Sequence, residues 1–392
     1  MNQFTAALSI EPLLTAALEE CREKACSSLS GARPDLALVF ASMHHRAGFE
    51  SLARDVQEAT GARVIMGCTG ETVIGGAREV EGHPALALWL AHLPGVELTP
   101  FHMSFEERDD ESWNITGMPD LGTLSSAERA SRRQSLLVFG EPFSFPMQQW
   151  LASLNEHHPG LLAFGGMASG AMSPGEHRLF LQDRVLERGA AMVLVEGLSV
   201  RNVVSQGCRP VGPAMVITKG EDNVIKELAG KPAMDKLREV FSASNARDRI
   251  LLQRALHVGQ VVDEHLSNPG IGDFLIKNVV GADQESGALV IGDFVRRGRT
   301  VRFHVRDAES ADEDLKQMLR KAGKGRTAAL LFSCNGRGTR LFETSDHDAR
   351  CVRDELGDIP VAGFFAQGEI GPVGSRNFLH GFTASLALFG GD

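Results

Sequence analysis

Short apolar runs recur along the chain in three groups that share one order. The first group has apolar runs at residues 35–41, 63–67 and 85–91, with an amphipathic stretch at 49–60. The second group spans residues 134–197 and the third spans residues 328–389, each with the same succession. Apolar runs of this length, separated by amphipathic segments and glycine-rich turns, predict strand, helix, strand and strand in every group.

This order also predicts how the strands pair. A helix between two strands favours a parallel pair joined by a right-handed crossover. The third strand follows a glycine-rich turn, so we expect it to return antiparallel. The fold class is therefore α/β, with mixed sheets flanked by helices and built from repeated strand-helix-strand-strand units.

The stretches outside the three groups follow other patterns. Apolar residues at helical spacing predict an amphipathic helix at residues 5–29. Between the second and third groups, helices are predicted at 223–228, 233–257 and 312–321, and strands at 213–219, 273–280, 288–295 and 300–305. No proline- or serine-rich linker marks a boundary, so we expect two interlocked domains that meet near residues 195–210.

Composition narrows the possible partners and the compartment. The chain has 392 residues and a formal net charge of -10, and its basic residues do not cluster, so we expect no nucleic-acid partner. Its apolar runs are too short to span a bilayer, so no membrane insertion is expected. The six cysteines show no metal-type spacing, and the N-terminus does not resemble a signal peptide. These features predict a cytoplasmic protein.

Two strand ends near the C-terminus carry the best candidate chemistry. Residues 361–372 read VAGFFAQGEIGP, and residues 333–338 read SCNGRG. Glu369 lies in a sharp glycine-flanked turn, and Arg337 is bracketed by glycines that allow a ligand to approach closely. A guanidinium and a carboxylate on neighbouring strand ends suit a small zwitterion such as an α-amino acid. The same pattern fits an ion pair between Arg337 and Glu369, or side chains that only hold the turns.

The Gly70–Glu71 step in the first group looks like the counterpart of Gly368–Glu369 in the third. The second group has Met167-Ala168-Ser169 at this place and lacks an acid. A turn repeated in this way favours a structural reason for the glycine–glutamate step.

Two cysteines, Cys68 and Cys334, also follow predicted strand ends, where an exposed thiol beside an arginine would be reactive. A cysteine hydrolase would need a histidine base such as His304 or His380, and no spacing favours one. The common hydrolase, metalloprotease and nucleotide-binding motifs are absent from the sequence, so we expect no catalysis.

Histidines raise the question of haem. The candidates for axial ligation are His44, His45, His102, His304 and His380. No C-x-x-C-H attachment motif occurs, and a single histidine on a strand is more often a core or edge residue, so we expect no cofactor and keep haem as an alternative. His44 and His45 are expected in an exposed loop.

Several of these motifs together resemble the FIST family, whose FIST-N and FIST-C domains are sensory domains of bacterial signalling proteins and of one eukaryotic F-box protein. The matching motifs are GCTGE at 67–71, SCNGRG at 333–338, GFFAQGEIG at 363–371 and HGFT at 380–383, with further matches at 207–213, 228–233 and 303–307. The resemblance implies a FIST-N domain at 33–205 and a FIST-C domain at 206–392, which follow the N-terminal helix expected within residues 1–32.

The resemblance also implies a non-catalytic sensor of a small molecule such as an amino acid. Some relatives are described as haem-binding nitric oxide sensors, and the eukaryotic relative recognises protein substrates, so a haem sensor and a protein-interaction module stay as alternatives, beside a hydrolase that uses Cys334. No kinase, cyclase, chemoreceptor or F-box segment is present, so we expect the output to pass through a separate signalling protein. The expected ligand-binding residues are Ser333, Cys334, Asn335, Gly336, Arg337, Gly368, Glu369, Cys68, Glu71 and His380.

Overall fold

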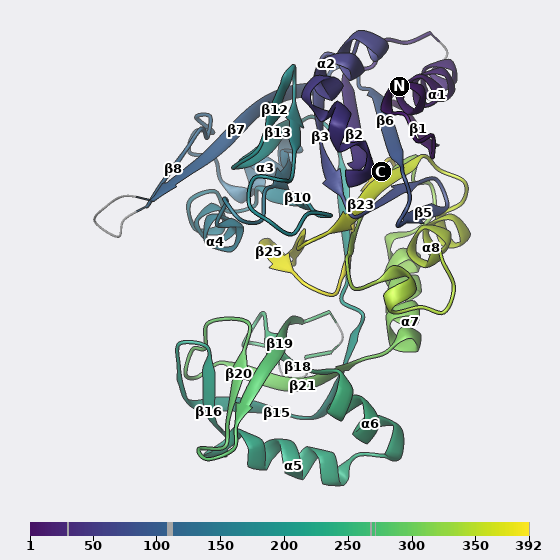
Figure 1. Cartoon of the computed structure of the whole chain (residues 1–392). Helices are drawn as coiled ribbons and strands as arrows, with labels where there is room; N and C mark the ends of the chain where they lie inside the picture. The colour runs from purple at the N-terminus through teal and green to yellow at the C-terminus, as the bar shows by residue number, and fades with distance from the viewer. Residues whose placement is uncertain (30, 108–112, 267–268, 271, 392) are drawn as a thin grey trace. The chain divides into compact units, whose positions relative to one another are not determined.

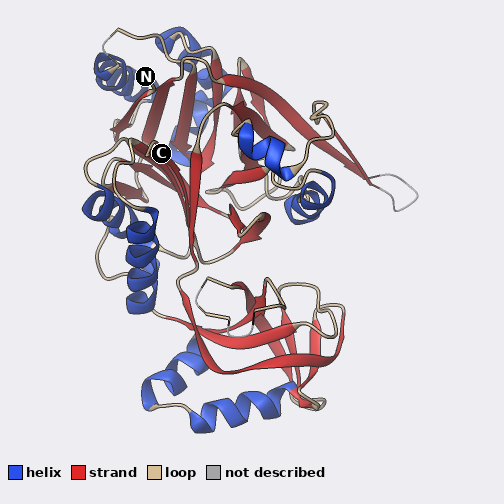
Figure 2. Cartoon of the chain, turned by 180° about the vertical axis from the view of Figure 1, so that it is seen from behind, coloured by secondary structure: helices blue, strands red, loops and turns tan. Residues whose placement is uncertain are grey.

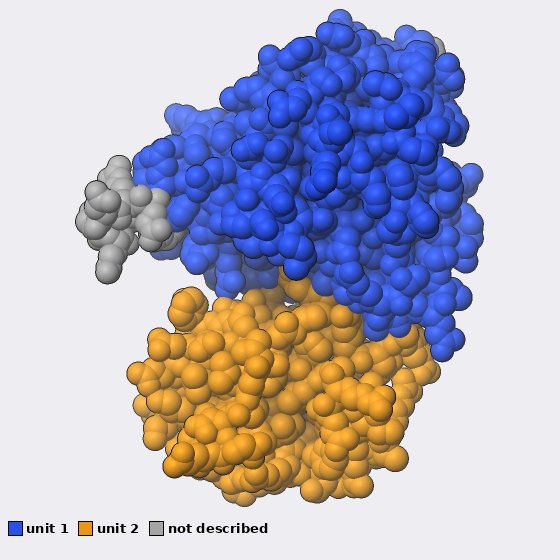
Figure 3. Space-filling model, viewed as in Figure 1, with its two compact units in different colours: residues 1–204, 316–379, 383–392 blue, residues 205–315, 380–382 orange. Residues whose placement is uncertain are grey.

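The computed structural model describes residues 1–29, 31–107, 113–266, 269–270 and 272–391. The chain forms two compact units (Figure 3). Unit 1 comprises residues 1–204, 316–379 and 383–392, and unit 2 comprises residues 205–315 and 380–382. The predicted domains at 33–205 and 206–392 divide the chain differently, because residues 316–379 pack with the N-terminal half.

Unit 1 contains three mixed sheets, one for each group of apolar runs (Figure 1). The first sheet has the order β1 (Gln3–Ser9), β6 (Leu86–His92), β2 (Leu36–Ser42), β3 (Val64–Gly70), β11 (Leu179–Leu181) and β12 (Arg184–Leu186). The second has the order β25 (Arg376–His380), β24 (Glu369–Val373), β10 (Leu162–Met167), β9 (Ser135–Gly140), β13 (Ala190–Glu196), β7 (Glu97–Glu107) and β8 (Trp113–Thr116). The third has the order β14 (Val200–Ser205), β26 (Ala384–Phe389), β22 (Ala328–Cys334), β23 (Val361–Ala366), β4 (Thr72–Gly75) and β5 (Arg78–Glu81).

The predicted strand pairing is confirmed in all three groups. The first two strands run parallel in each group, as β2–β3, β9–β10 and β22–β23. The third strand returns antiparallel beside the first, as β6, β13 and β26. The mixed α/β class expected from the sequence is therefore correct.

What the sequence did not show is that each glycine-rich turn is a β-hairpin that pairs with the sheet of another group. The hairpin β4–β5 of the first group pairs with β23 of the third. The hairpin β11–β12 of the second group pairs with β3 of the first, and β24 of the third group pairs with β10 of the second. This cyclic exchange interlocks the three groups. Separating any one group from the other two would break strand pairs in two sheets.

The paired registers define equivalent positions in the three groups. In the parallel pairs, Gly67 lies opposite Val39, Gly165 opposite Val138 and Gly363 opposite Leu331. A Cβ atom at any of these glycines would lie within 2.0 Å of the carbonyl oxygen of the opposite residue, so the three glycines share one steric role.

The residues that follow those three opposite positions are Phe40, Phe139 and Phe332, all fully buried. The ring centroids of Phe40 and Phe139 are 5.4 Å apart, and those of Phe139 and Phe332 are 5.9 Å apart. One phenylalanine from each group thus meets the others in a core shared by the three sheets.

Helices cover the sheets of unit 1 (Figure 2). The first group has α1 (Leu14–Ser28), the short 3-10 helix η1 (Met43–Gly48) and α2 (Phe49–Thr60). The second has α3 (Ser126–Ser131) and α4 (Met147–His157), and the third has α7 (Ala308–Ala322), whose second half lies in unit 1, the 3-10 helix η2 (Gly338–Arg340) and α8 (His347–Leu356). None of the helices in the described part of the chain is long and apolar enough to cross a membrane.

Two predictions of secondary structure were wrong, and a third, the helix at 233–257, is two helices at 233–243 and 246–254 followed by a strand that begins at Leu256. The predicted helix at 5–29 begins only at Leu14, because residues 3–9 pair with β6 as an edge strand and Pro12 separates the two elements. The predicted helix at 223–228 is strand β16 (Val224–Leu228), which pairs with β15 and β20. In the first segment, pairing with a distant strand overrides a weak local preference. In the second, a two-residue turn at 222–223 joins β16 to β15 as a hairpin, and β20 pairs on the other side.

Unit 2 is an insertion in the third group. Its sheet has the order β15 (Cys208–Glu221), β21 (Thr300–Arg306), β18 (Leu256–Val261), β19 (Phe274–Asp283), β20 (Ala288–Ile291), β16 (Val224–Leu228) and β17 (Lys231–Pro232), with helices α5 (Ala233–Ala243) and α6 (Ala246–Arg254). An additional pairing of β15 with β16 closes this sheet on itself. In the first group the edge strand β1 is followed directly by α1. In the third group most of unit 2 lies between the edge strand β14 and the helix α7.

Candidate functional site

Unit 1 contains a cavity of about 410 Å³ at the carboxyl ends of its parallel strands. This is where open α/β sheets commonly bind ligands, and the size suits a small molecule. Its lining residues come from all three groups, and they are Met43, His44, Glu71, Thr72, Glu81, Gly82, Gly170, Asn335, Thr339, Arg340 and Phe365. The cavity therefore depends on the interlocked arrangement rather than on any single group.

An acid and a guanidinium lie together on this lining. Arg340 of η2 forms an ion pair with Glu71, in which its Nη1 donates to Glu71 Oε2 at 3.3 Å. The same Nη1 donates to the carbonyl oxygen of Asn335 at 2.8 Å. The hydrogen bond to Glu71 raises the pKa of Arg340 above its ordinary value. Both side chains are substantially exposed, at 57% for Arg340 and 34% for Glu71.

A second carboxylate lies on the same lining. Glu81, at the end of β5, accepts hydrogen bonds from the backbone nitrogen of Thr339 at 3.0 Å and from its hydroxyl at 2.7 Å. Gly338 packs against this carboxylate so closely that a Cβ atom there would lie 2.7 Å from Glu81 Oε1. The position of the Glu81 carboxylate is thus fixed by the start of η2.

Asn335 adds a hydrogen-bond acceptor. Its Oδ1 is buried and accepts no hydrogen bond from any described residue. A buried amide oxygen without a donor is costly, since buried polar atoms are normally hydrogen-bonded. A ligand that carries an N–H or O–H group would satisfy it.

The backbone hydrogen bonds that join the ends of the parallel strands differ at one of the three junctions between groups, and the cavity lies at that junction. At two junctions between groups, equivalent backbone atoms bond directly, with Ser169 N donating to Thr69 O and Gln367 N donating to Met167 O, both at 3.1 Å. At the third junction, the hydroxyl of Ser169 stands between the groups. It accepts from Glu71 N at 2.8 Å and donates to Phe365 O. Because Glu71 and Phe365 both line the cavity, Ser169 holds its wall where the third direct bond would lie.

Arg337, predicted to bind a ligand, is fully buried and is absent from the cavity lining. It donates two hydrogen bonds to Asp348 of α8, at 2.6 and 2.8 Å, and Ser333 donates a third to the same carboxylate at 2.7 Å. Burial alone would lower the pKa of Arg337, but the attraction of Asp348 raises it, and the same pair holds the pKa of Asp348 below its usual range. In these contacts Arg337 fixes the end of β22 to the helix α8.

Glu369 is also fully buried and is absent from the lining. Its Oε2 accepts from the backbone nitrogen of Thr383 at 3.1 Å and from its hydroxyl at 2.8 Å. The register shows that Glu369 corresponds to Val73, whereas Glu71 corresponds to Gln367. The two glycine–glutamate steps are therefore not equivalent, which corrects the expectation from sequence.

The other predicted residues are dispersed. Cys68 is fully buried, which raises the pKa of its thiol. Cys334 and Gly336 are partly exposed, and the carbonyl oxygen of Gly368 accepts a hydrogen bond from Met167 N at 2.8 Å. His380 is buried and belongs to unit 2. Among the predicted residues, Glu71 and Asn335 line the cavity; whether any of them binds a ligand stays a prediction.

Sequence reasoning missed Arg340, Thr339 and Glu81. Arg340 lies three residues after Arg337, one turn further along the same loop, so the motif located the region but not the residue. Glu81 had no signal in the sequence, because it reaches the third sheet only through the exchanged hairpin.

His45 differs from its expected position, whereas His44 and His304 match the expectations from sequence. His44 is exposed as expected, but His45 is buried, and burial lowers its pKa. His304 is buried in unit 2, where desolvation lowers its pKa to about 4 and its Nδ1 contacts the carbonyl oxygen of Arg302. His257 has the same kind of backbone contact, to Ala255.

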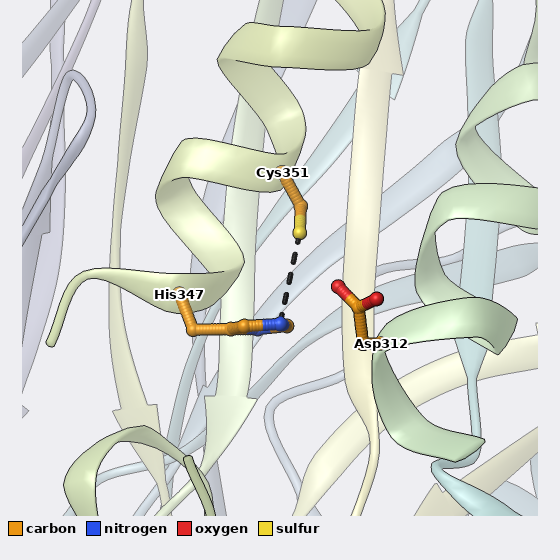
Figure 4. Close-up of side chains that lie close together, drawn as sticks. All are labelled: Asp312, His347 and Cys351. Atoms are coloured by element: carbon orange, nitrogen blue, oxygen red, sulfur yellow. Dashed lines mark hydrogen bonds between the residues drawn. The ribbon is translucent and has the colours of Figure 1, made fainter. Parts of the chain in front are cut away.

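A thiol and an imidazole lie one turn apart on α8 (Figure 4). Cys351 Sγ is 3.9 Å from His347 Nε2, and His347 Nδ1 is 2.9 Å from Asp348 Oδ1. Asp312, drawn in the same figure, belongs to unit 2, so we assign no metal site to the three residues. The sequence motifs point to Cys334 rather than Cys351 as a candidate nucleophile.

Comparison with known proteins gives consistent matches over most of the chain. The FIST N domain model matches residues 35–231, and the FIST C domain model matches residues 233–372. An uncharacterized protein of Mycobacterium tuberculosis is 41% identical over 386 residues, which cover 97% of this chain and 98% of that protein. An uncharacterized protein of Mycobacterium bovis is 39% identical over 377 residues, which cover 95% of each chain.

Proposed function

This chain belongs to the FIST family, whose domains are sensory domains that bind small ligands in signal transduction, and we propose that its ligand is a small zwitterion the size of an amino acid. The Arg340–Glu71 pair on the cavity lining carries this proposal. The ligand carboxylate would bind the planar guanidinium of Arg340, which suits a bidentate contact. The ligand ammonium would bind Glu71 and donate to Asn335 Oδ1.

The energetics of the two arginine pairs support this choice of residues. An exposed ion pair contributes only about 0–1 kcal/mol to folding, so a ligand can separate Arg340 from Glu71 at little cost. Removing one partner of a buried pair costs about 3–5 kcal/mol, because the other charge is left without compensation. Arg337 and Asp348 form such a buried pair. Arg340 is therefore the arginine available to a ligand, and Arg337 is a structural residue.

A thermal-shift panel of amino acids and small carboxylates tests the proposal. A ligand at about 100 times its Kd adds roughly 2.7 kcal/mol of stability, which gives a clear rise in Tm. We expect at least one zwitterion to shift the wild type and the shift to disappear in Arg340→Met and in Glu71→Gln. Arg320→Met is the matched control, because Arg320 forms an exposed ion pair with Glu355 away from the cavity.

The proposal fails if no zwitterion shifts the wild type, or if the shift persists unchanged in both cavity variants. A Soret band in protein purified after expression with haem would favour the haem sensor instead. The output of such a sensor would pass through a separate signalling protein, and ligand-dependent capture of that protein would identify it.

A further inference from the structure

The charges on the cavity lining do not balance. Arg340 is the formal cation, and Glu71 and Glu81 are formal anions, with His44 as the other titratable side chain. Arg340 forms its ion pair with Glu71. A simple zwitterion would bring one charge of each sign and leave the excess negative charge in place.

Glu81 is the anion on this lining without an ion-pair partner among the described residues, and its charge contributes, after that of Glu71, to the raised pKa of Arg340. Its hydrogen-bond donors are the backbone nitrogen and the hydroxyl of Thr339, both neutral, and no described residue forms an ion pair with it. Each carboxylate oxygen can accept two hydrogen bonds, so Glu81 keeps acceptor capacity toward the cavity. Thr339 and Gly338 fix its position, so a ligand would not have to order this side chain.

We infer that the ligand of this cavity is an amino acid with a second cationic group on its side chain, which binds Glu81. This inference rests on the proposed function and refines it. The α-carboxylate binds Arg340, the α-ammonium binds Glu71 and Asn335 Oδ1, and the side-chain cation binds Glu81. Hydrogen bonds between a cation and a carboxylate are among the stronger polar contacts, so the second cation gives selectivity as well as affinity.

L-Lysine and L-norleucine provide the matched pair of probes. They differ chiefly in the terminal group of the side chain, which is an ammonium in lysine and a methyl group in norleucine. We expect isothermal titration calorimetry on the full chain to show lysine binding at least about tenfold tighter, which corresponds to about 1.4 kcal/mol. A wild-type protein that binds norleucine as tightly as lysine overturns the inference and leaves the proposed function standing. If neither probe nor any other amino acid binds, both fail.

Glu81→Gln locates the selectivity. Glutamine keeps one acceptor oxygen for the Thr339 backbone N–H, and its NH2 group can donate to the Thr339 hydroxyl oxygen. We therefore expect the fold and the affinity for norleucine to be kept and the preference for lysine to fall below about threefold. Glu355→Gln, which alters the carboxylate that pairs with Arg320 away from the cavity, should keep the full preference. A lysine preference that survives in Glu81→Gln assigns the second cation to another residue and refutes this role of Glu81.

Discussion

Replacing Arg337 with methionine should unfold unit 1 far more easily than replacing Arg340 with methionine. Arg337 and Asp348 have fully buried side chains, and Arg337 donates two hydrogen bonds to the Asp348 carboxylate. Methionine fills much of the same volume but leaves Asp348 with the Ser333 hydroxyl and the His347 contact as its remaining polar partners. The expected loss is about 3–5 kcal/mol of unfolding free energy. Arg340→Met removes an exposed pair and should change the free energy by less than about 1 kcal/mol.

Tryptophan fluorescence during urea unfolding measures this difference in the right part of the molecule. The three tryptophans, Trp89, Trp113 and Trp150, all belong to unit 1. The fluorescence transition therefore reports on unit 1 even if unit 2 unfolds separately, and a single free energy applies only to that transition. Equal shifts of the midpoint in the two variants would refute the distinction between a structural and a ligand-binding arginine.

Three further predictions follow from buried contacts. Burial, and then the charge of Asp348, raise the pKa of Glu79 to about 8. Protonated Glu79 therefore stabilises the folded state fully below its unfolded pKa near 4.5, and this stabilisation is lost as the pH rises toward 8, by up to about 1.4 kcal/mol per pH unit. Glu79→Gln should accordingly flatten the fall in the free energy of unfolding between pH 5 and 8. Urea midpoints measured across that range check this, and an unchanged slope contradicts it. Phe139→Ala should lower the free energy of unfolding, followed by tryptophan fluorescence, by about 3–5 kcal/mol, because Phe139 contacts Phe40 and Phe332 in the shared core. A decrease below about 1 kcal/mol would show that the three groups do not pack together at these rings. Ser169→Ala should weaken binding of the amino acid that gives the largest thermal shift, because the hydroxyl that contacts Glu71 and Phe365 is lost. Ser169→Thr keeps this hydroxyl and should retain the wild-type affinity. Equal affinities in the two variants would show that the Ser169 hydroxyl does not position the cavity wall.

Local pattern was enough to predict much of unit 1. The apolar runs and amphipathic stretches placed α2, α4 and α8 and the three parallel pairs, because strand and helix periodicity is a property of neighbouring residues. The exchange of hairpins could not be predicted, since it depends on contacts between groups that lie far apart in sequence. The same limitation explains β1, where pairing with a distant strand decides the conformation. β16 differs, because it pairs with the neighbouring β15 across a two-residue turn as well as with the more distant β20.

The candidate site shows a related division. The sequence indicated an acid and a guanidinium at the strand ends, and the structure has such a pair, but in Glu71 and Arg340 rather than in Glu369 and Arg337. Burial makes the difference: Arg337 and Glu369 point into the protein and meet Asp348 and Thr383. The motif around residues 333–338 located the loop, but only the fold shows which arginine faces the cavity.

A crystal structure of the full chain, grown with the amino acid that gives the largest thermal shift, would show whether a zwitterion lies between Arg340 and Glu71 in unit 1. We expect the ligand carboxylate on the Arg340 guanidinium and the ligand ammonium beside Glu71 and Asn335. Ligand density elsewhere in the protein, with the Arg340–Glu71 ion pair intact, would contradict it.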